Sequence, residues 1–219
     1  MTKKERYQAF IDHFSHHQPE ATTELEFNNP FELLVAVVLS AQCTDKRVNI
    51  VTKELFADFP TPQSLAASSF DELFPYIKSI SYPNNKTKHL LGLGKMLVED
   101  FNSEIPLDVD ELQKLPGVGR KTANVVVSTL DNQPTMPVDT HVFRVSKRLG
   151  LATQNSTTPL AVEKQLVKNI PEEHIPKAHH WLILHGRYVC LARKPKCGEC
   201  QITHFCRYFD RVYRKKVNK

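Results

Sequence analysis

Apolar residues recur along most of this chain at spacings of three and four, the period of an α-helix. Val48, Val51 and Leu55 share one helical face in this way. Thr44 before them is a helix-start signal, and Pro60 ends the pattern. Similar patterns cover residues 90–101, 122–130, 140–149, 160–170 and 177–191. Because no convincing segment alternates with period two, the pattern predicts an all-α fold.

Glycines weaken one of these helices, and two short sequences resemble helix starts. Gly92 and Gly94 lower the helical propensity of residues 90–101. Ser69 and Asp108 are each followed three residues later by a glutamate, which is the sequence of a capping box. We therefore expect helices to begin after both residues.

The most apolar segment, residues 31–39, is hydrophobic nearly all round. Asn29 before it is a good N-cap residue, and Pro30 is favoured at a first helical position. A buried strand has the same pattern over five residues, but the length and the start signal favour a helix. The segment is predicted to be a buried central helix.

The chain of 219 residues, 41% hydrophobic and 24% charged, has the composition of a globular protein of one or two domains. No apolar segment approaches the ~20 residues of a membrane helix, and the start of the chain lacks a signal-peptide core. We expect a cytoplasmic protein without a membrane partner. A reducing compartment favours metal binding or catalysis over disulfides for the five cysteines.

Four of the cysteines form a dense cluster. Cys190, Cys197, Cys200 and Cys206 lie within seventeen residues, separated by six, two and five residues. Four soft ligands indicate a metal centre. Zinc sites more often contain two paired knuckles, so the long arms favour a 4Fe–4S cluster over zinc, and either over disulfides. Cys43 lies far from this cluster and is expected to be a small buried hydrophobic residue.

The carboxy-terminal part of the chain is basic. The net charge is +5, but residues 187–219 contain ten Lys or Arg and two acids, a local charge of +8. Such a pole is typical of proteins that bind polyanions, although a solvated tail has the same composition. Arg193 and Lys194 stand inside the cysteine cluster, and we expect this loop to face DNA phosphates.

The sequence 115–123 contains two glycines and a lysine between two helical patterns. Gly117 and Gly119 around Val118 allow a tight hairpin with positive φ. This hairpin and the helix start after it can bind a phosphate, so these three residues are predicted to contact DNA. An ordinary helix–helix turn is the alternative. Lys121 falls at this helix start, where the macrodipole is expected to depress the pKa of its amine from about 10.4. Partial burial would lower it further, and a neutral lysine forms Schiff bases with carbonyl carbons.

Asp139 lies eighteen residues after Lys121, where it is placed to cap the helix 140–149. A carboxylate at a helix start can also stabilise a cationic transition state, such as the sugar cation formed when a glycosidic bond breaks. Capping and catalysis do not exclude each other here.

Three motifs together resemble the endonuclease III family of helix-hairpin-helix DNA glycosylases. They are L-P-G-V-G-R-K-T-A at 115–123, V-D-T-H-V-F-R-V at 138–145, and H-H-W-L-I-L-H-G-R-Y-V-C at 179–190, which runs into the four-cysteine loop. The resemblance covers nearly the whole chain, and the order of the motifs makes it highly specific.

The resemblance implies roles for individual residues. Lys121 would be the Schiff-base nucleophile, Asp139 the catalytic carboxylate, and the four clustered cysteines the ligands of a 4Fe–4S cluster. Gln42 would fill the space left by a flipped base. Where the family commonly has an aliphatic wedge, this chain has Tyr82, which can stack on the orphaned base.

The resemblance also implies two helical lobes with DNA between them. Residues 23–133 would form one lobe, with the helix-hairpin-helix at about 109–130. Residues 1–22 and 134–219 would form a discontinuous second lobe that carries the cluster loop 190–206.

The implied function is that of a monomeric, nucleoid-associated bifunctional glycosylase and lyase. It would act on double-stranded DNA that holds a damaged base, an oxidised pyrimidine in particular, or an abasic site, and would cut 3′ to the lesion by β-elimination. Two alternatives are a monofunctional glycosylase, which Lys121 argues against, and a non-catalytic iron–sulfur DNA-binding module. Such a module would have no reason to combine Lys121 with Asp139.

Overall fold

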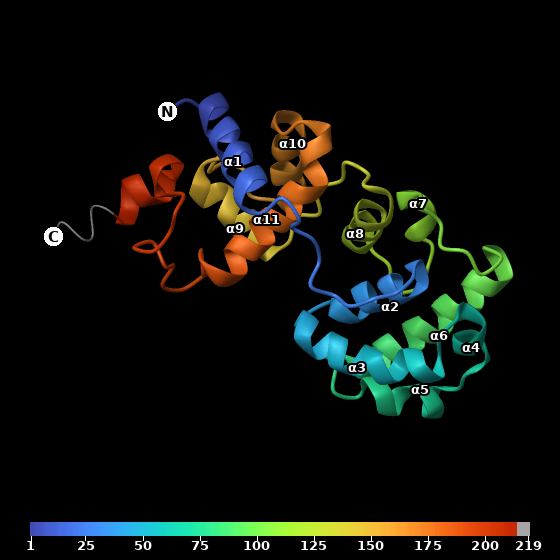
Figure 1. Cartoon of the computed structure of the whole chain (residues 1–219). Helices are drawn as coiled ribbons and strands as arrows, with labels where there is room; N and C mark the ends of the chain where they lie inside the picture. Colours follow the sequence, from blue (N-terminus) through green and yellow to red (C-terminus); the bar gives the residue numbers. More distant parts are fainter. Residues whose placement is uncertain (214–219) are drawn as a thin grey trace. The chain divides into compact units, whose positions relative to one another are not determined.

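The computed structural model describes residues 1–213 as helices joined by turns and loops (Figure 1). Within these residues there is no β-strand, so the all-α prediction is confirmed.

Internal contacts divide the chain into two compact units. The central unit, Thr23–Asp131, contains α2 (Pro30–Ser40), α3 (Asp45–Asp58), α4 (Pro62–Ala67), α5 (Phe70–Ile77), α6 (Pro83–Asp100), α7 (Val109–Leu112) and α8 (Arg120–Asp131). The terminal unit joins Met1–Thr22 to Asn132–Lys219. It contains α1 (Lys3–His17), α9 (Thr140–Leu149), α10 (Pro159–Asn169), α11 (Ile175–Tyr188) and the short helices η1 (Glu172–His174), η2 (Thr203–Phe205) and η3 (Phe209–Tyr213).

Helix α2 lies at the centre of the hydrophobic core of the central unit. The side chain of Asn29 accepts a hydrogen bond from the N–H of Glu32 at 2.9 Å, and Pro30 opens the helix, as predicted. All of residues 31–39 are buried, because α2 contacts α3, α6 and α8. The buried-helix prediction is therefore confirmed. Cys43, which was expected to be buried, is half-buried against this core.

The two glycines that weaken the helical prediction do not interrupt α6, which is continuous from Pro83 to Asp100. A Cβ atom on Gly94 would lie 2.9 Å from the backbone nitrogen of Ala66 in α4. A Cβ atom on Gly92 would lie 3.1 Å from Cγ of Pro116. Each glycine lowers helix stability by about 1 kcal/mol relative to alanine. The close packing that both glycines allow offsets this cost.

One of the two expected capping boxes is complete. The Ser69 hydroxyl accepts from the N–H of Glu72 at 3.3 Å, and the Glu72 carboxylate accepts from the N–H of Ser69 at 2.8 Å. Asp108 caps α7 by accepting from two N–H groups of its first turn at 2.9 Å. The Glu111 carboxylate pairs with Lys114 at 2.7 Å. Glu111 of this four-residue helix thus forms an ion pair with a residue beyond the helix end in place of the reciprocal half of the second expected box.

Aromatic rings from both ends of the sequence meet in the core of the terminal unit. The ring centroids of Phe10 and Phe14 in α1 each lie 5.8 Å from that of Trp181 in α11. The indole N–H of Trp181 donates to the carbonyl of Gln18 at 2.8 Å. These contacts attach the amino-terminal helix to the carboxy-terminal half of the chain.

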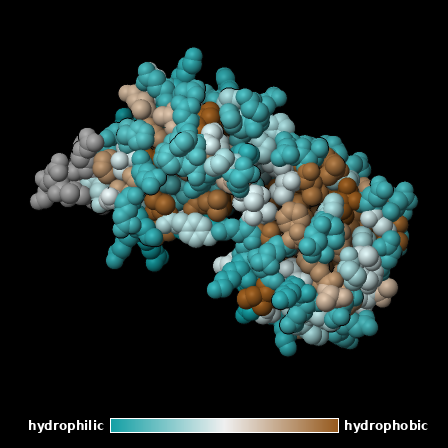
Figure 2. Space-filling view, in the orientation of Figure 1, coloured by the Kyte–Doolittle hydropathy of each residue, from teal (hydrophilic) through white to brown (hydrophobic). Residues whose placement is uncertain are grey.

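Hydrophilic residues cover most of the visible face of the terminal unit (Figure 2). None of the helices within residues 1–213 is long and apolar enough to cross a membrane.

Candidate functional site

The glycine-rich sequence 115–123 forms the turn that follows α7 and the first four residues of α8. Gly117 has a φ of +82°, a left-handed conformation that favours glycine. A Cβ atom there would also lie 2.9 Å from Cβ of His89 in α6. Gly119 differs, because no heavy atom lies within 4 Å of the place its Cβ would take. The backbone is therefore open at Gly119, and another backbone can approach it.

Helix α8 begins at Arg120, directly after this turn, so the N–H groups of its first turn point out of the helix. Lys121 is its second residue. Its side chain is exposed, so the partial burial that was considered for its amine is not found in the structure. The prediction that Val118 contacts DNA needs a correction. Its side chain is 6% exposed and its N–H donates to the carbonyl of Leu115 at 3.1 Å, so it anchors the turn in the core.

Gln42 and Tyr82 lie at two linked loop tips of the central unit. Both have left-handed backbones, with φ values of +56° and +58°. The Ser81 hydroxyl donates to the carbonyl of Gln42 at 2.7 Å and so joins the two tips. Gln42 is exposed, and the Tyr82 side chain is 61% exposed. The structure thus brings together two exposed side chains that are far apart in sequence.

Asp139 caps α9, as predicted. Its Oδ1 atom accepts from the N–H of Val142 at 2.7 Å, and the residue is half-buried. A carboxylate has a second oxygen, which can face a positive charge while the first oxygen caps the helix. Asp139 belongs to the terminal unit, and Lys121 belongs to the central unit.

The four clustered cysteines are free thiols. Cys190 and Cys206 are buried, and Cys197 and Cys200 are half-buried. Burial raises the pKa of Cys197 and Cys200 and raises the pKa of Cys206 to about 11, and charge repulsion among the cysteines adds to each shift. Thiols crowded in this way form thiolates readily only around a cationic centre, so the set fits a metal cluster.

In residues 1–213 no three His, Cys, Asp or Glu side chains converge closely enough for a single metal ion.

Two arginines of α9 hold the start of the cysteine segment. The Nε atom of Arg144 donates to the carbonyl of Cys190 at 3.1 Å. The Nη1 atom of Arg148 donates to the carbonyl of Leu191 at 2.7 Å and to Sγ of Cys190 at 3.4 Å. The helix that Asp139 caps is therefore hydrogen-bonded to the cluster loop. Sequence reasoning missed both arginines, although their spacing of four places them on one helical face.

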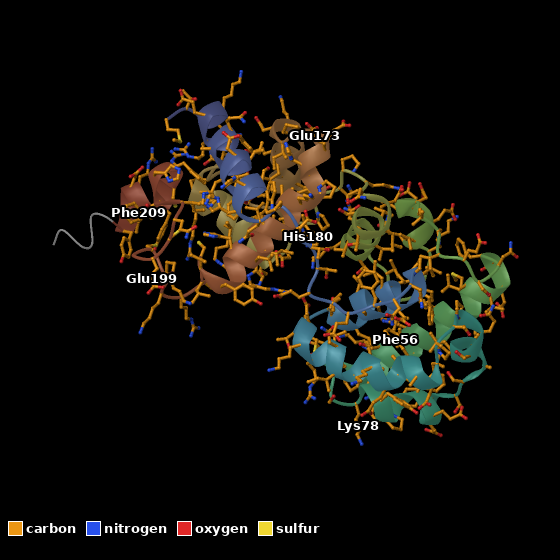
Figure 3. All side chains as sticks on the ribbon, in the orientation of Figure 1. Phe56, Lys78, Glu173, His180, Glu199 and Phe209 are labelled. Atoms are coloured by element: carbon orange, nitrogen blue, oxygen red, sulfur yellow. The ribbon has the colours of Figure 1, made fainter. Side chains whose placement is uncertain are left out.

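Arg193 and Lys194 are exposed on the loop between Cys190 and Cys197, as expected of phosphate contacts. Glu199, which is labelled in Figure 3, is an exposed acid between Cys197 and Cys200.

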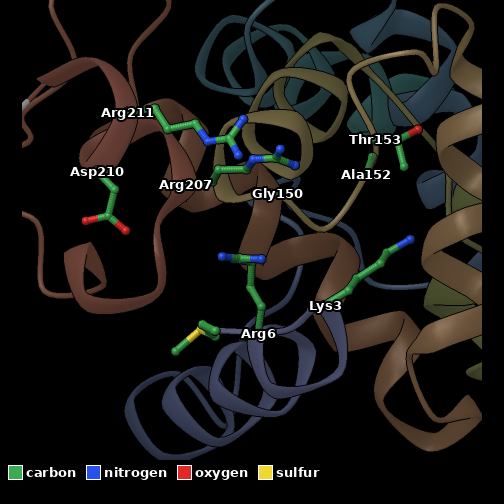
Figure 4. Close-up of a pocket in the computed structure, with 9 residues that line it drawn as sticks. Lys3, Arg6, Gly150, Ala152, Thr153, Arg207, Asp210 and Arg211 are labelled. Atoms are coloured by element: carbon green, nitrogen blue, oxygen red, sulfur yellow. The ribbon is translucent and has the colours of Figure 1, made fainter.

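Other basic residues gather in a separate pocket of about 360 Å³ (Figure 4). Lys3 and Arg6 of α1 line it together with Arg207, Arg211 and the backbone at the carboxyl end of α9, whereas Asp139 caps the other end of that helix. Asp210 is the acid among the residues that line this pocket. Four of the ten basic residues of the segment 187–219, Arg214, Lys215, Lys216 and Lys219, lie outside the described residues.

Comparison with known proteins assigns the chain to a family. Residues 35–172 match the HhH-GPD superfamily of base excision DNA repair proteins, and residues 190–206 match the iron–sulfur binding domain of endonuclease III. The endonuclease III of Rickettsia felis (strain ATCC VR-1525 / URRWXCal2) is 53% identical over 197 residues, which are 90% of this chain and 92% of that protein. The chain belongs to the endonuclease III family. The Escherichia coli (strain K12) member is 44% identical over 212 residues, or 97% and 99% of the two chains.

A solved structure agrees with this assignment. It is a trapped endonuclease III–DNA covalent intermediate, an estranged-adenine complex. It matches with a TM-score of 0.90 and 47% identity over 100% of both chains.

Membership of the endonuclease III family decides among the functions considered above. The protein is a base excision repair enzyme, a DNA glycosylase with abasic-site lyase activity that binds DNA. Its cofactor is a 4Fe–4S cluster. This assignment decides against zinc and against disulfides as the role of the four clustered cysteines. The predicted family, activity and cofactor are confirmed.

Proposed function

We propose that the protein releases oxidised pyrimidines from double-stranded DNA and cuts the strand 3′ to the abasic site, with Lys121 as its nucleophile. The observation that carries the proposal is the place of Lys121, exposed on the first turn of α8 beside the open backbone of Gly119. The solved relative was trapped as a covalent intermediate with DNA, which supports covalent chemistry of this kind.

The neutral amine of Lys121 attacks C1′ of the damaged nucleotide. The bond between C1′ and the base breaks, and the base leaves with the bonding electrons and takes up a proton. The nitrogen loses one proton and the C1′–O4′ bond breaks, so that O4′ keeps the bonding electrons and takes up a proton, which leaves a protonated Schiff base at C1′. Loss of a proton from C2′ then expels the 3′ phosphate by β-elimination. Water hydrolyses the Schiff base and returns the amine of Lys121.

Asp139 stabilises the positive charge that develops on the sugar as the base departs. Its carboxylate is fixed by the hydrogen bond from Val142, so it needs no reorganisation at the moment of reaction. The hydrogen bonds of Arg144 and Arg148 to the cluster loop hold the same helix in place.

DNA is held by several groups. The N–H groups at the start of α8, with Gly117 shaping the turn and Gly119 leaving room, bind a phosphate. Arg193 and Lys194 bind further phosphates, while Gln42 and Tyr82 enter the base stack. The protein acts as a monomer on the chromosome in the cytoplasm.

The lesion preference is tested with three labelled duplexes of one sequence, holding an oxidised pyrimidine, a mismatch or no damage. We expect the oxidised pyrimidine to be released fastest by the unmodified enzyme. A faster release from the mismatch would contradict the assigned substrate class while leaving the lyase assignment intact.

We also propose that Cys190, Cys197, Cys200 and Cys206 are the four cluster ligands. The bound cluster supplies iron–thiolate bonds that brace a loop with little core of its own. Cys200→Ser is expected to lose the yellow-brown absorbance of a protein with four iron atoms per chain and to lower the melting temperature. Cys43→Ser is the control and should keep both. Full iron content in Cys200→Ser would contradict the ligand assignment.

Affinity for DNA is expected to fall steeply with salt, because bound phosphates release counterions. Neutralising Arg193 and Lys194 to glutamine should reduce the slope of log K against log salt by about 2, with little change in lesion preference. Neutralising Lys164 and Lys168, two exposed lysines of α10, removes the same charge from another surface of the unit. Equal slopes for the two double variants would show that the loop does not contact phosphates.

A further inference from the structure

Lys86 is a buried cation of the central unit that the chemistry above does not use. It is 5% exposed and lies on α6, one turn after Tyr82. Its Nζ atom donates to the carbonyl of Leu39 at 2.8 Å and to that of Ala41 at 2.7 Å. These carbonyls lie at the end of α2, where helical carbonyls lack partners within the helix and the macrodipole is negative.

Burying a cation is unfavourable unless polar groups compensate for the lost water. Burial lowers the pKa of Lys86, with a smaller opposing effect from Cys43. An apolar residue would fill this position without that cost, so the two hydrogen bonds are the physical reason for a lysine.

Lys86 is bonded to both loop tips. Its side chain binds the carbonyl of Ala41, the residue before Gln42, and its own N–H donates to the carbonyl of Tyr82 at 3.1 Å. Ser81 adds the direct link to Gln42 described above. Left-handed backbone at a non-glycine residue is disfavoured roughly tenfold when nothing holds it. The side-chain bonds of Lys86 and Ser81 to the carbonyls of Ala41 and Gln42 are placed to hold it.

We propose that Lys86 is a positioning residue for base extrusion, which keeps the Gln42 and Tyr82 tips in the conformation that enters the DNA base stack. This inference rests on the proposed function, in which both tips occupy the space around a flipped nucleotide. A tip fixed before binding loses less conformational freedom when it inserts, so more of the contact energy is available for extrusion.

The test compares Lys86→Met, which keeps the unbranched stem but has no donor, with Lys95→Met, an exposed lysine further along α6. The rate of borohydride trapping is measured for each variant on an abasic site in a duplex and on the same site in a single strand. The single strand has no base stack to fill. Lys86→Met is expected to slow trapping on the duplex about tenfold and to stay within about twofold of the unmodified enzyme on the single strand. Lys95→Met should change neither rate.

A double-mutant cycle separates positioning from a general structural role. In the Gln42→Ala background, Lys86→Met should slow duplex trapping less than it does alone, because the tip that it positions no longer inserts. If Lys86→Met does not fold, Ser81→Ala should give a weaker loss of the same duplex-specific kind. An equal loss on both substrates, full additivity with Gln42→Ala, or an unchanged duplex rate would each overturn the proposal. An unmodified enzyme that traps on neither substrate would contradict the proposed function and this proposal with it.

Discussion

Lys121→Gln is expected to abolish both strand cleavage at abasic sites and borohydride-trappable adducts. Glutamine has no nucleophilic amine, so no Schiff base can form. Binding to a duplex that contains a stable abasic-site analogue should stay within about threefold, because backbone N–H groups hold the phosphate at the hairpin. Cleavage and adducts are measured on denaturing gels, and binding is measured by titration at fixed salt.

Lys114 provides a matched control for this variant. It is an exposed lysine of the same hairpin, and its Nζ atom lies 2.7 Å from the carboxylate of Glu111. Lys114→Gln should keep full trapping and cleavage. If Lys121→Gln retained its adducts, another amine would be the nucleophile, and the role proposed for Lys121 would have to be abandoned.

Asp139→Asn is expected to slow base release by about 10²- to 10³-fold, the usual cost of losing one charge-stabilising group. The fold should change little, because asparagine is an equally good N-cap and can accept the same bond from Val142. Single-turnover base release gives the rate, and thermal melting gives the stability.

Asp139→Ala separates the two roles of this carboxylate. Alanine removes both the charge and the cap, so this variant should be as slow as Asp139→Asn and less stable by about 1 kcal/mol. An Asp139→Asn protein that melted early but kept full activity would show that Asp139 is only a cap.

The parts of this fold that were predicted correctly are those with local causes. Asn29 and Pro30 begin α2, Ser69 begins α5, and Asp139 begins α9, because a cap and the N–H groups it binds lie within four residues. The apolar period likewise depends on neighbours in sequence. This period over several segments, with no convincing segment of period two, predicted the all-α fold.

Residues whose partners are distant in sequence could not be predicted in this way. The lysine of α6 that binds the end of α2, and the arginines of α9 that bind the cluster loop, show no local sign of those partners. Val118 was assigned to the DNA surface from its place between two glycines, but the turn directs it into the core. Gly94 lowers helix propensity, yet the helix requires it because α4 packs against it.

Mapping the cross-link identifies the amine that forms the covalent bond to DNA, which we propose is that of Lys121. The unmodified enzyme is trapped with borohydride on a duplex that contains an abasic site, and the cross-linked protein is digested. The peptide that carries the nucleotide is then sequenced by mass spectrometry. We expect the modification on Lys121, within the hairpin sequence 115–123. A modification on any other lysine, or on the amino terminus, would show that Lys121 is not the nucleophile.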